Sequence, residues 1–177
     1  MTNYKGIISY EFNKNFFDVI FDHSSKVAIS FIQSFRPDLI AIKNYDYRTH
    51  WENIYKEERE RQDGFFIEAY EVLNEDKNPI GYYVARINNK TLICNTCLPG
   101  KRKYAKEPVV LDLQMWRDLF DFAKEQGCNK YIWETDKNGI IWKALKMMAR
   151  KLDNDITFTE WQNPLQNGYS TMEIKLD

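Results

Sequence analysis

The hydrophobic period of the sequence changes from 3.6 to 2 at about residue 64. Apolar and polar residues alternate in the three stretches that follow, GFFIEAYEVL, PIGYYVARI and TLICNTCL. Such alternation is typical of half-buried β-strands. The connectors, NEDKN and Asn88-Asn89-Lys90, are rich in residues that tolerate the positive φ of tight turns. The sequence therefore predicts an antiparallel meander over about residues 64–98.

Helical patterns lie on both sides of this meander. Before it, the sequence predicts a strand at 5–11 and a helix at 16–35. This helix is expected to break near Asp22–Ser25, with Ser24 as the cap of its second piece. A short strand or extended segment should follow at LIAIKNY, and then a helix that is capped by Asp46 and runs to about Gln62. After it, we expect a helix at 109–126 that ends at Gly127, a strand at NKYIWET, a helix at 138–152, and closing strands at DITFTEW and YSTMEIKL. Strands mixed with helices in this way indicate an α/β domain.

The composition narrows the class of protein. The chain has 177 residues with 11 Phe, 11 Tyr and 5 Trp, which suits one domain with an aromatic-rich core. Its formal net charge of −1 gives no general attraction to nucleic acid or to an anionic membrane. No apolar run is long enough to span a bilayer, and the N-terminus does not resemble a targeting segment. Three cysteines favour a reducing compartment, so a cytoplasmic location is predicted.

The stretch ICNTCLPGKRKYAK, residues 93–106, allows two interpretations. A zinc site needs four ligands, and only Cys128 remains as a third thiol. Moreover, Cys94 and Cys97 should point to opposite faces of an uninterrupted strand, so we predict buried thiols and no metal. Alternatively, a strand, a Pro-Gly turn, cations and a helix N-terminus form an arrangement that binds phosphate. A solvated basic loop remains the other interpretation of Lys101–Lys106.

The order of elements resembles the GNAT acetyltransferase superfamily. The resemblance is carried by residues 64–177, above all by FAKEQGCNKYIWETDKNGIIWKAL, while residues 1–63 resemble only a variant of the family's opening strand and helices. It implies a single acetyltransferase-like domain over 1–177, with an N-terminal strand and helices at 1–63 and a sheet with cofactor-type helices at 64–177. The implied fold is α/β, with a mixed, mainly antiparallel sheet and helices on both faces.

The resemblance also implies acetyl-CoA as the cofactor. Pantetheine would lie along the strand Leu92–Leu98 and the pyrophosphate at Lys101–Lys106. The implied cofactor-binding residues are Ile93, Cys94, Cys97, Leu98, Lys101, Arg102, Lys103 and Asn138.

Two departures from the family pattern bear on activity. The family's glycine-rich pyrophosphate loop corresponds to Glu107–Asp112, which has no glycine and carries two carboxylates. One carboxylate about 4 Å from a phosphate costs roughly 4 kcal/mol at an effective dielectric constant of ~20. In addition, Leu145 stands where many members have a tyrosine that protonates the leaving thiolate. A basic, glycine-free loop with this leucine is similar in style to acetyltransferase-like internal virion proteins of tailed phages.

Acyl transfer would also need a base for the amine, directly or through water. The candidate catalytic residues are Glu68 and Glu134, with Tyr131 or Tyr104 as a substitute acid; Glu71 and His50 are also near the predicted sheet and helices. Alternation nevertheless predicts solvent-facing structural roles for Glu68 and Glu71. Trp133 and Trp142 are expected in the core.

Two functions remain open from the sequence. The first is an acyl-CoA-dependent N-acyltransferase with an amine acceptor. The second is a catalytically silent protein of the same fold, without cofactor, that has a structural or interaction role, as in a phage virion or against a host protein. Nucleic-acid binding through Lys101–Lys106 with Tyr104 is disfavoured by the neutral balance of charge. Neither homo-oligomerisation nor a virion location is decided by the sequence.

Overall fold

The computed structural model describes residues 3–61, 63–100, 103, 113–136, 146–147, 150–151, 156–163 and 166–176. Its elements are β1 (Asn3–Ser9), α1 (Lys14–Phe35), the 3₁₀ helix η1 (Pro37–Ala41), α2 (Tyr47–Arg61), β2 (Phe65–Leu73), β3 (Asp76–Asn88), β4 (Thr91–Pro99), α3 (Leu113–Glu125), β5 (Lys130–Asp136), β6 (Ile156–Asn163) and β7 (Gln166–Lys175). The strands form one sheet in the order β1-β2-β3-β4-β5-β7-β6. Only the β4–β5 pair is parallel among the described pairs.

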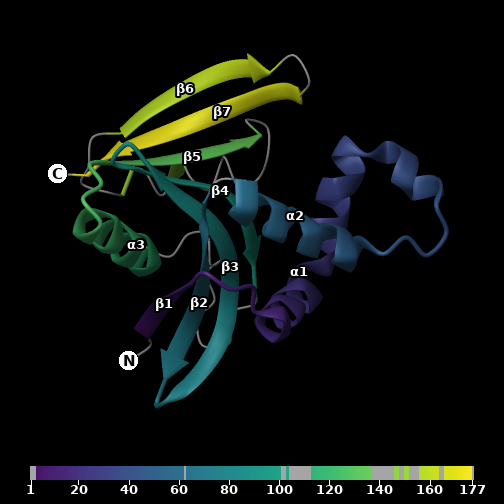
Figure 1. Cartoon of the computed structure of the whole chain (residues 1–177), viewed down its shortest axis with the longest axis horizontal. Coiled ribbons are helices and arrows are strands. Elements are labelled where there is room, and N and C mark those ends of the chain that lie inside the picture. The colour runs from purple at the N-terminus through teal and green to yellow at the C-terminus, as the bar shows by residue number, and fades with distance from the viewer. Residues whose placement is uncertain are drawn as a thin grey trace.

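Helices cover both faces of this sheet (Figure 1). Helix α3 packs on one face, where its Phe120 and Ala123 join Phe65 and Ile67 of β2 in a buried cluster. Helices α1 and α2 cover the other face, and Phe66 points into that second cluster. Consecutive residues of β2 thus supply two different cores, as a strand buried on both faces must. The predicted mixed, mainly antiparallel sheet with helices on both faces is confirmed.

The meander is confirmed together with its turns. Asn74 and Glu75 join β2 to β3 with φ of 49° and 74°, and Asn89 and Lys90 join β3 to β4 with φ of 47° and 58°. Two consecutive residues with positive φ are typical of the two-residue hairpin turns that match the twist of a sheet. Gly127, with φ of 78°, ends α3 as expected.

Helix α1 is continuous, so the predicted break near Asp22–Ser25 is wrong. Asn13 caps the helix, because its Oδ1 accepts a hydrogen bond from the Phe16 N–H at 3.1 Å. Ser24, expected to be a cap, is a buried residue in mid-helix. The buried stripe continues through this region to Ala28 and Ile32, and the packing of that stripe outweighs the low helix propensity of the serines.

The segment LIAIKNY is not a strand. Residues Pro37–Ala41 form η1, and of its apolar side chains Leu39 is buried against α1 and α2. Ile40 and Ile42 are 61% and 50% exposed. The expectation failed because an apolar run is extended only where a neighbouring strand can pair with it, and this segment lies beyond the sheet (Figure 1).

Helix α2 begins where it was predicted to begin. Asp46 caps it, since its Oδ1 accepts from the Thr49 N–H at 3.0 Å. Trp51 and Tyr55 are buried on its inner side as expected. None of the described helices is both long and apolar enough to cross a membrane.

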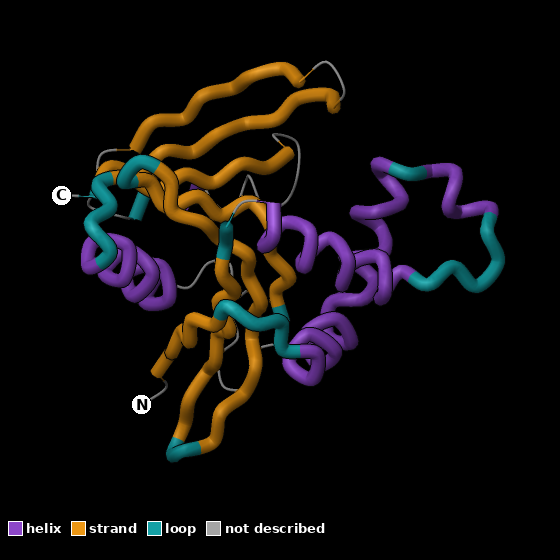
Figure 2. The backbone as a smooth tube through the Cα atoms, in the orientation of Figure 1, coloured by secondary structure: helices purple, strands orange, loops and turns teal. Residues whose placement is uncertain are grey.

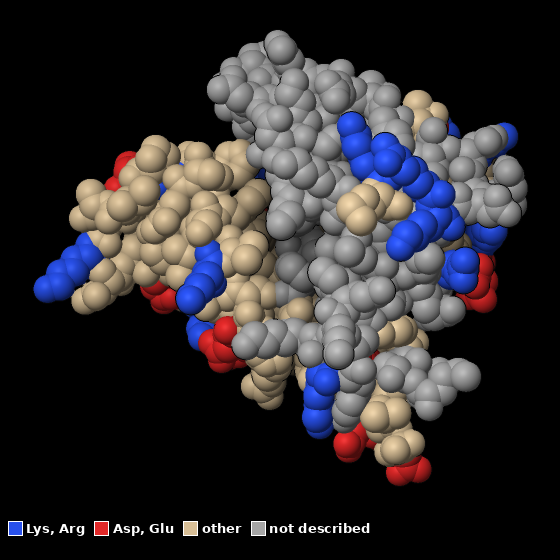
Figure 3. All heavy atoms as spheres, turned by 180° about the vertical axis from the view of Figure 1, so that it is seen from behind, with Lys and Arg blue, Asp and Glu red and all other residues tan. Residues whose placement is uncertain are grey.

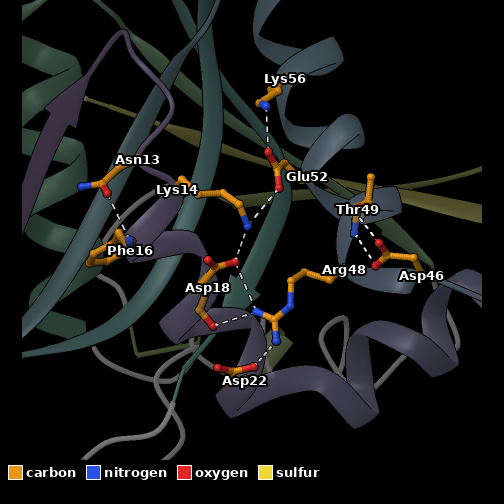
Figure 4. A network of polar contacts seen from close by, with 10 residues as sticks. All are labelled: Asn13, Lys14, Phe16, Asp18, Asp22, Asp46, Arg48, Thr49, Glu52 and Lys56. Atoms are coloured by element: carbon orange, nitrogen blue, oxygen red, sulfur yellow. Dashed lines mark hydrogen bonds and ion pairs between the residues drawn. The ribbon is translucent and has the colours of Figure 1, made fainter.

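An ion-pair network joins α1 to α2 (Figure 4). Lys14 of α1 contacts Asp18 at 2.6 Å and Glu52 of α2 at 3.2 Å. Arg48 of α2 contacts Asp18 at 3.2 Å and also pairs with Asp22. The hydrogen bond from Lys14 lowers the pKa of Asp18. The network therefore contributes stability while Asp18 is ionised.

Replacing Asp18 with asparagine should lower the free energy of unfolding at pH 7 by less than about 1 kcal/mol, because the pairs are partly exposed. A lowered carboxyl pKa gives stability that is present above the unfolded pKa of about 3.9 and is lost as pH falls through the lower folded value. Urea unfolding at pH 7 and in strong acid should therefore show the difference from wild type vanishing in acid. Asp63→Asn, at an exposed residue, is the control; an equal effect there would contradict the assignment.

Candidate functional site

The strands β4 and β5 lie side by side over only part of their lengths. Their parallel pairing joins Thr91–Cys94 to Lys130–Trp133. β4 then continues to Pro99 and β5 to Asp136, but no further pair joins these two described ends. The strands separate in the traces of Figures 1 and 2. We call the region between these two ends the slot; on its other side β4 pairs there with β3.

A β-bulge marks the start of this slot. Ala85 of β3 pairs with Cys94 but Val84 pairs with Thr96, so Asn95 is an extra residue in β4. A bulge bends a strand and increases its twist. Because it follows the last β4–β5 pair directly, it turns the rest of β4 away from β5. It also exchanges the faces of the strand: Cys94 lies in the α3-side core, whereas Leu98 lies in the α1–α2-side core.

The bulge changes the register on which the prediction for Cys94 and Cys97 rests. Their backbone partners in β3 are Ala85 and Tyr83. The side chain of Cys97 lies outside what the structure describes, so the face that it occupies stays a prediction. Cys94 and Cys128 are buried, as expected of small apolar side chains. The described residues hold no group of three or more His, Cys, Asp or Glu that could bind a metal ion.

The predicted cofactor-binding residues of β4 fall on both sides of the bulge. Ile93 and Cys94 lie in the half that pairs with β5, and Cys94 is fully buried. Cys97 and Leu98 lie in the half that borders the slot, where Leu98 is 2% exposed. The structure thus brings Cys97 and Leu98 to the slot, while Ile93 and Cys94 precede it. Their contact with a cofactor stays a prediction.

The basic loop is described at one residue only. Lys101, Arg102 and Asn138 lie outside the described residues. The backbone N–H of Lys103 donates a hydrogen bond of 2.7 Å to Oε2 of Glu71. Glu71 is 0% exposed and also accepts from Asn78 Nδ2 at 3.3 Å. At Lys103, therefore, a carboxylate of the protein holds a backbone N–H that a phosphate-binding loop would offer to its ligand.

The predicted solvent-facing role of Glu71 is wrong, and so is that of Glu68. Side chains on both faces of β2 are buried. Alternation along this strand therefore does not distinguish solvent-exposed from buried side chains. Glu68 is 6% exposed, and its two oxygens accept from Asn13 Nδ2 at 3.0 Å and from the Tyr70 hydroxyl at 2.9 Å. Burial, followed by this bond to Glu68, raises the pKa of Tyr70 to about 12, so its hydroxyl remains a donor at neutral pH.

Glu68 is separated from the slot by one strand. The register places Glu68 opposite Tyr82 of β3, and Tyr82 opposite Leu98 of β4. With about 4.8 Å between neighbouring strands, Glu68 lies roughly 10 Å from the backbone of β4. It lines instead a cleft of about 320 Å³ with Ser9 and Glu11–Asn15, at the start of α1. A role as a base would therefore need bridging water.

The other catalytic candidates lie on β5. Tyr131 is 0% exposed in the α3-side core, with its ring 5.3 Å from that of Phe120. It precedes the slot, since it pairs with Leu92. Glu134 follows Trp133, the last residue of β5 that pairs with β4, so its backbone lies at the start of the slot. Trp133 is buried, which confirms the core role expected of it. The catalytic roles of Glu68, Glu134 and Tyr131 stay predictions.

Several solved structures with a similar fold are acetyltransferases. An acetyltransferase of Bacillus subtilis in complex with CoA matches with a TM-score of 0.55 at 12% identity, over 99% of this chain and 100% of the other. Spermidine N-acetyltransferase of Vibrio cholerae, in complex with CoA and spermine, matches with 0.56 at 11% identity, over 99% and 95%. A GNAT-family acetyltransferase of Staphylococcus aureus matches with 0.52 at 16% identity, over 99% and 100%.

No protein-family model matches the sequence, and no curated protein matches it. The similarity is therefore one of structure at low sequence identity, and it extends over nearly the whole chain. Together with the mixed sheet and the slot between β4 and β5, it shows that the protein has the fold of GNAT acetyltransferases.

Proposed function

We propose that this protein binds an acyl-CoA thioester, such as acetyl-CoA, in the slot between β4 and β5 and transfers the acyl group to an amine. The observation that carries the proposal is the loss of pairing between β4 and β5 beyond Cys94 and Trp133. The edge of β4 from Asn95 to Pro99 has backbone groups that β5 does not pair. Such an edge binds an extended, amide-containing chain as a further strand would. Pantetheine is a chain of this kind, and three structures of the same fold contain CoA.

A bound acyl-CoA supplies a thioester carbonyl, to which a neutral amine adds and from which a thiolate leaves. The chain must hold this carbonyl near backbone N–H donors, and we place it at the bulge of Asn95, where the ladder between β3 and β4 is interrupted. It must also accept a proton from the amine. Glu134 is the candidate whose backbone is nearest the start of the slot, and Glu68 would act through water.

A second function is favoured by the bond between Lys103 and Glu71. A loop whose N–H is held by a buried carboxylate has one donor fewer for phosphate. Tyr131, the proposed replacement for the acid, is enclosed in the core. We therefore keep, as the alternative, a catalytically silent protein of this fold that acts through a protein partner, such as a virion or host protein.

Binding of CoA tests the first function directly. Isothermal titration with CoA and with acetyl-CoA should give micromolar dissociation constants if the slot holds pantetheine. Hydrogen exchange should then slow at the amides of Asn95–Leu98, because the bound chain pairs with that edge, and should stay unchanged in β2. Adenosine 3′,5′-bisphosphate, which lacks pantetheine, is the matched control ligand and should not protect β4.

Each other outcome is informative. Heat without protection of β4 would mean that CoA binds away from the slot and would contradict the proposal. No heat and no thermal shift at millimolar ligand would favour the silent alternative. If CoA binds, acetyl transfer to alkylamines and to peptide amines, followed as release of the free thiol, separates an active enzyme from a binding protein.

A further inference from the structure

An arm extends from the sheet. It comprises residues 27–42, which are the C-terminal part of α1 and the whole of η1. It projects beyond the strands (Figures 1 and 2). The first half of α1 packs on the sheet through Phe16, Phe17 and Ile20. The arm is held differently, by α2: Trp51 donates a hydrogen bond from its Nε1 to the Ala28 carbonyl at 2.9 Å.

Large apolar side chains remain exposed on this arm. Val27, Phe31 and Phe35 are 58%, 43% and 38% exposed, and Ile40 and Ile42 are 61% and 50% exposed. Val27, Phe31 and Phe35 recur every four residues, so they form one line along α1, which we call the stripe. The rings of Phe31 and Phe35 are 4.8 Å apart. Since an aromatic side chain has roughly 150–250 Å² of surface, the five residues together expose on the order of 400 Å². A patch of that size on a monomer is often an interaction site.

We propose that the stripe is the contact between two copies of this chain, which pair through α1 in an antiparallel, two-fold arrangement. The charges on the arm agree with such pairing. Residues 27–35 contain no Asp, Glu, Lys or Arg. Arg36 and Asp38, which follow, neutralise each other at 2.7 Å. A surface without net charge can meet its own copy without repulsion, whereas a membrane or nucleic-acid contact would need cations.

The spacing of the stripe makes it complementary to itself. In an antiparallel pair with Phe31 on the two-fold axis, Phe31 meets Phe31, and Val27 of each copy lies opposite Phe35 of the other. A small side chain thus faces a large one on both sides of the axis, as close packing of two helices requires. Figure 3 shows one face of the arm, and most of its atoms there belong to residues other than Lys, Arg, Asp and Glu.

The area fits a weak, transient dimer. Two copies of the three-residue stripe would bury on the order of 500 Å² of apolar surface, which lies in the range of weak contacts, below about 1,200 Å². The affinity expected for so small a contact is micromolar. The pairing is independent of the acyl-CoA proposal, because no residue of the slot takes part in it.

Sedimentation equilibrium of the full chain tests the pairing. At up to about 100 µM, wild type should show a monomer–dimer equilibrium, and Val27→Glu should raise the dissociation constant by at least about tenfold, since two buried carboxylates would have to approach the contact. Val19→Glu, at a 40% exposed residue two turns before Val27 and so beyond the end of the paired segment, is the matched control and should leave the constant unchanged. A wild type that stays monomeric would overturn the proposal, and so would a Val27→Glu variant that dimerises as well as wild type.

A cross-link gives a second test that does not depend on the glutamate variant. A residue on a two-fold axis meets itself, so Phe31→Cys should form a disulfide-linked dimer on mild oxidation, whereas Val19→Cys should not. Cys94 and Cys128 are buried, and oxidised wild type measures their contribution. Failure of Phe31→Cys to cross-link, or equal cross-linking of Val19→Cys, would overturn the two-fold arrangement.

Discussion

Replacement of Phe17 by alanine is expected to lower the free energy of unfolding by about 4 kcal/mol. Phe17 is 0% exposed at the centre of the α1–α2-side core. Its ring lies 5.3 Å from that of Phe12, 5.6 Å from that of Tyr55 and 5.9 Å from that of Phe21. Removing it leaves a cavity between α1, α2 and the sheet, and rigid aromatic neighbours cannot collapse into such a cavity.

Urea or thermal unfolding, followed by circular dichroism, measures this loss. Phe35→Ala removes the same side chain from the same helix, but Phe35 is 38% exposed, so its loss should cost no more than about 1 kcal/mol. Equal losses for the two variants would mean that α1 does not pack on the sheet as described. Because the core of α1 also covers the end of β4, Phe17→Ala should weaken any ligand binding in the slot as well.

Replacement of Glu71 by alanine should have the second largest effect, a loss of about 2–3 kcal/mol. Its carboxylate is completely buried and accepts hydrogen bonds from Lys103 N and Asn78 Nδ2. Alanine removes Oε2, the acceptor of both bonds, and leaves a void at a position that is 0% exposed. Glu71→Gln can keep an oxygen at the position of Oε2, which accepts both bonds, and should therefore lose clearly less stability than Glu71→Ala.

The same unfolding measurements apply, with Glu75→Ala in the exposed turn between β2 and β3 as the control. An alanine variant as stable as wild type would show that the Lys103–Glu71 contact is not formed in solution. The hydrogen bond between Lys103 and Glu71 can also be tested by proteolysis of the loop that contains Lys103. Trypsin should cleave after the basic residues 101–106 faster in Glu71→Ala than in wild type, since the variant no longer holds the loop at Lys103.

Much of the fold could be predicted because local chemistry decides it. The meander follows from alternation and from Asn74 and Asn89, which adopt the positive φ of their turns. The break predicted in α1 failed because the serines near residue 24 are poor helix formers only in isolation; packed between Phe21 and Ala28, they remain helical. The prediction of a strand at LIAIKNY was wrong. A strand forms only beside another strand that pairs with it, and the local sequence does not show whether such a strand is near.

The candidate site was harder to predict for a physical reason. The bulge at Asn95 leaves no mark in the pattern, since Leu92, Cys94 and Leu98 are all buried at even positions although they serve two different cores. The burial of Glu68 and Glu71 could not be predicted either, because alternation implies a solvent-exposed face that β2 does not have. Of the cofactor-binding residues predicted on β4, Cys97 and Leu98 lie beyond the last β4–β5 pair, and their contact with a cofactor stays a prediction.

The extra residue in β4 makes one strand a member of two structural neighbourhoods. Cys94 lies in the α3-side core, whereas Leu98, four residues later, lies in the α1–α2-side core. Substitutions at these two positions are thus felt by different sets of neighbours and can accumulate independently. The unpaired end of β4 begins where these two neighbourhoods meet.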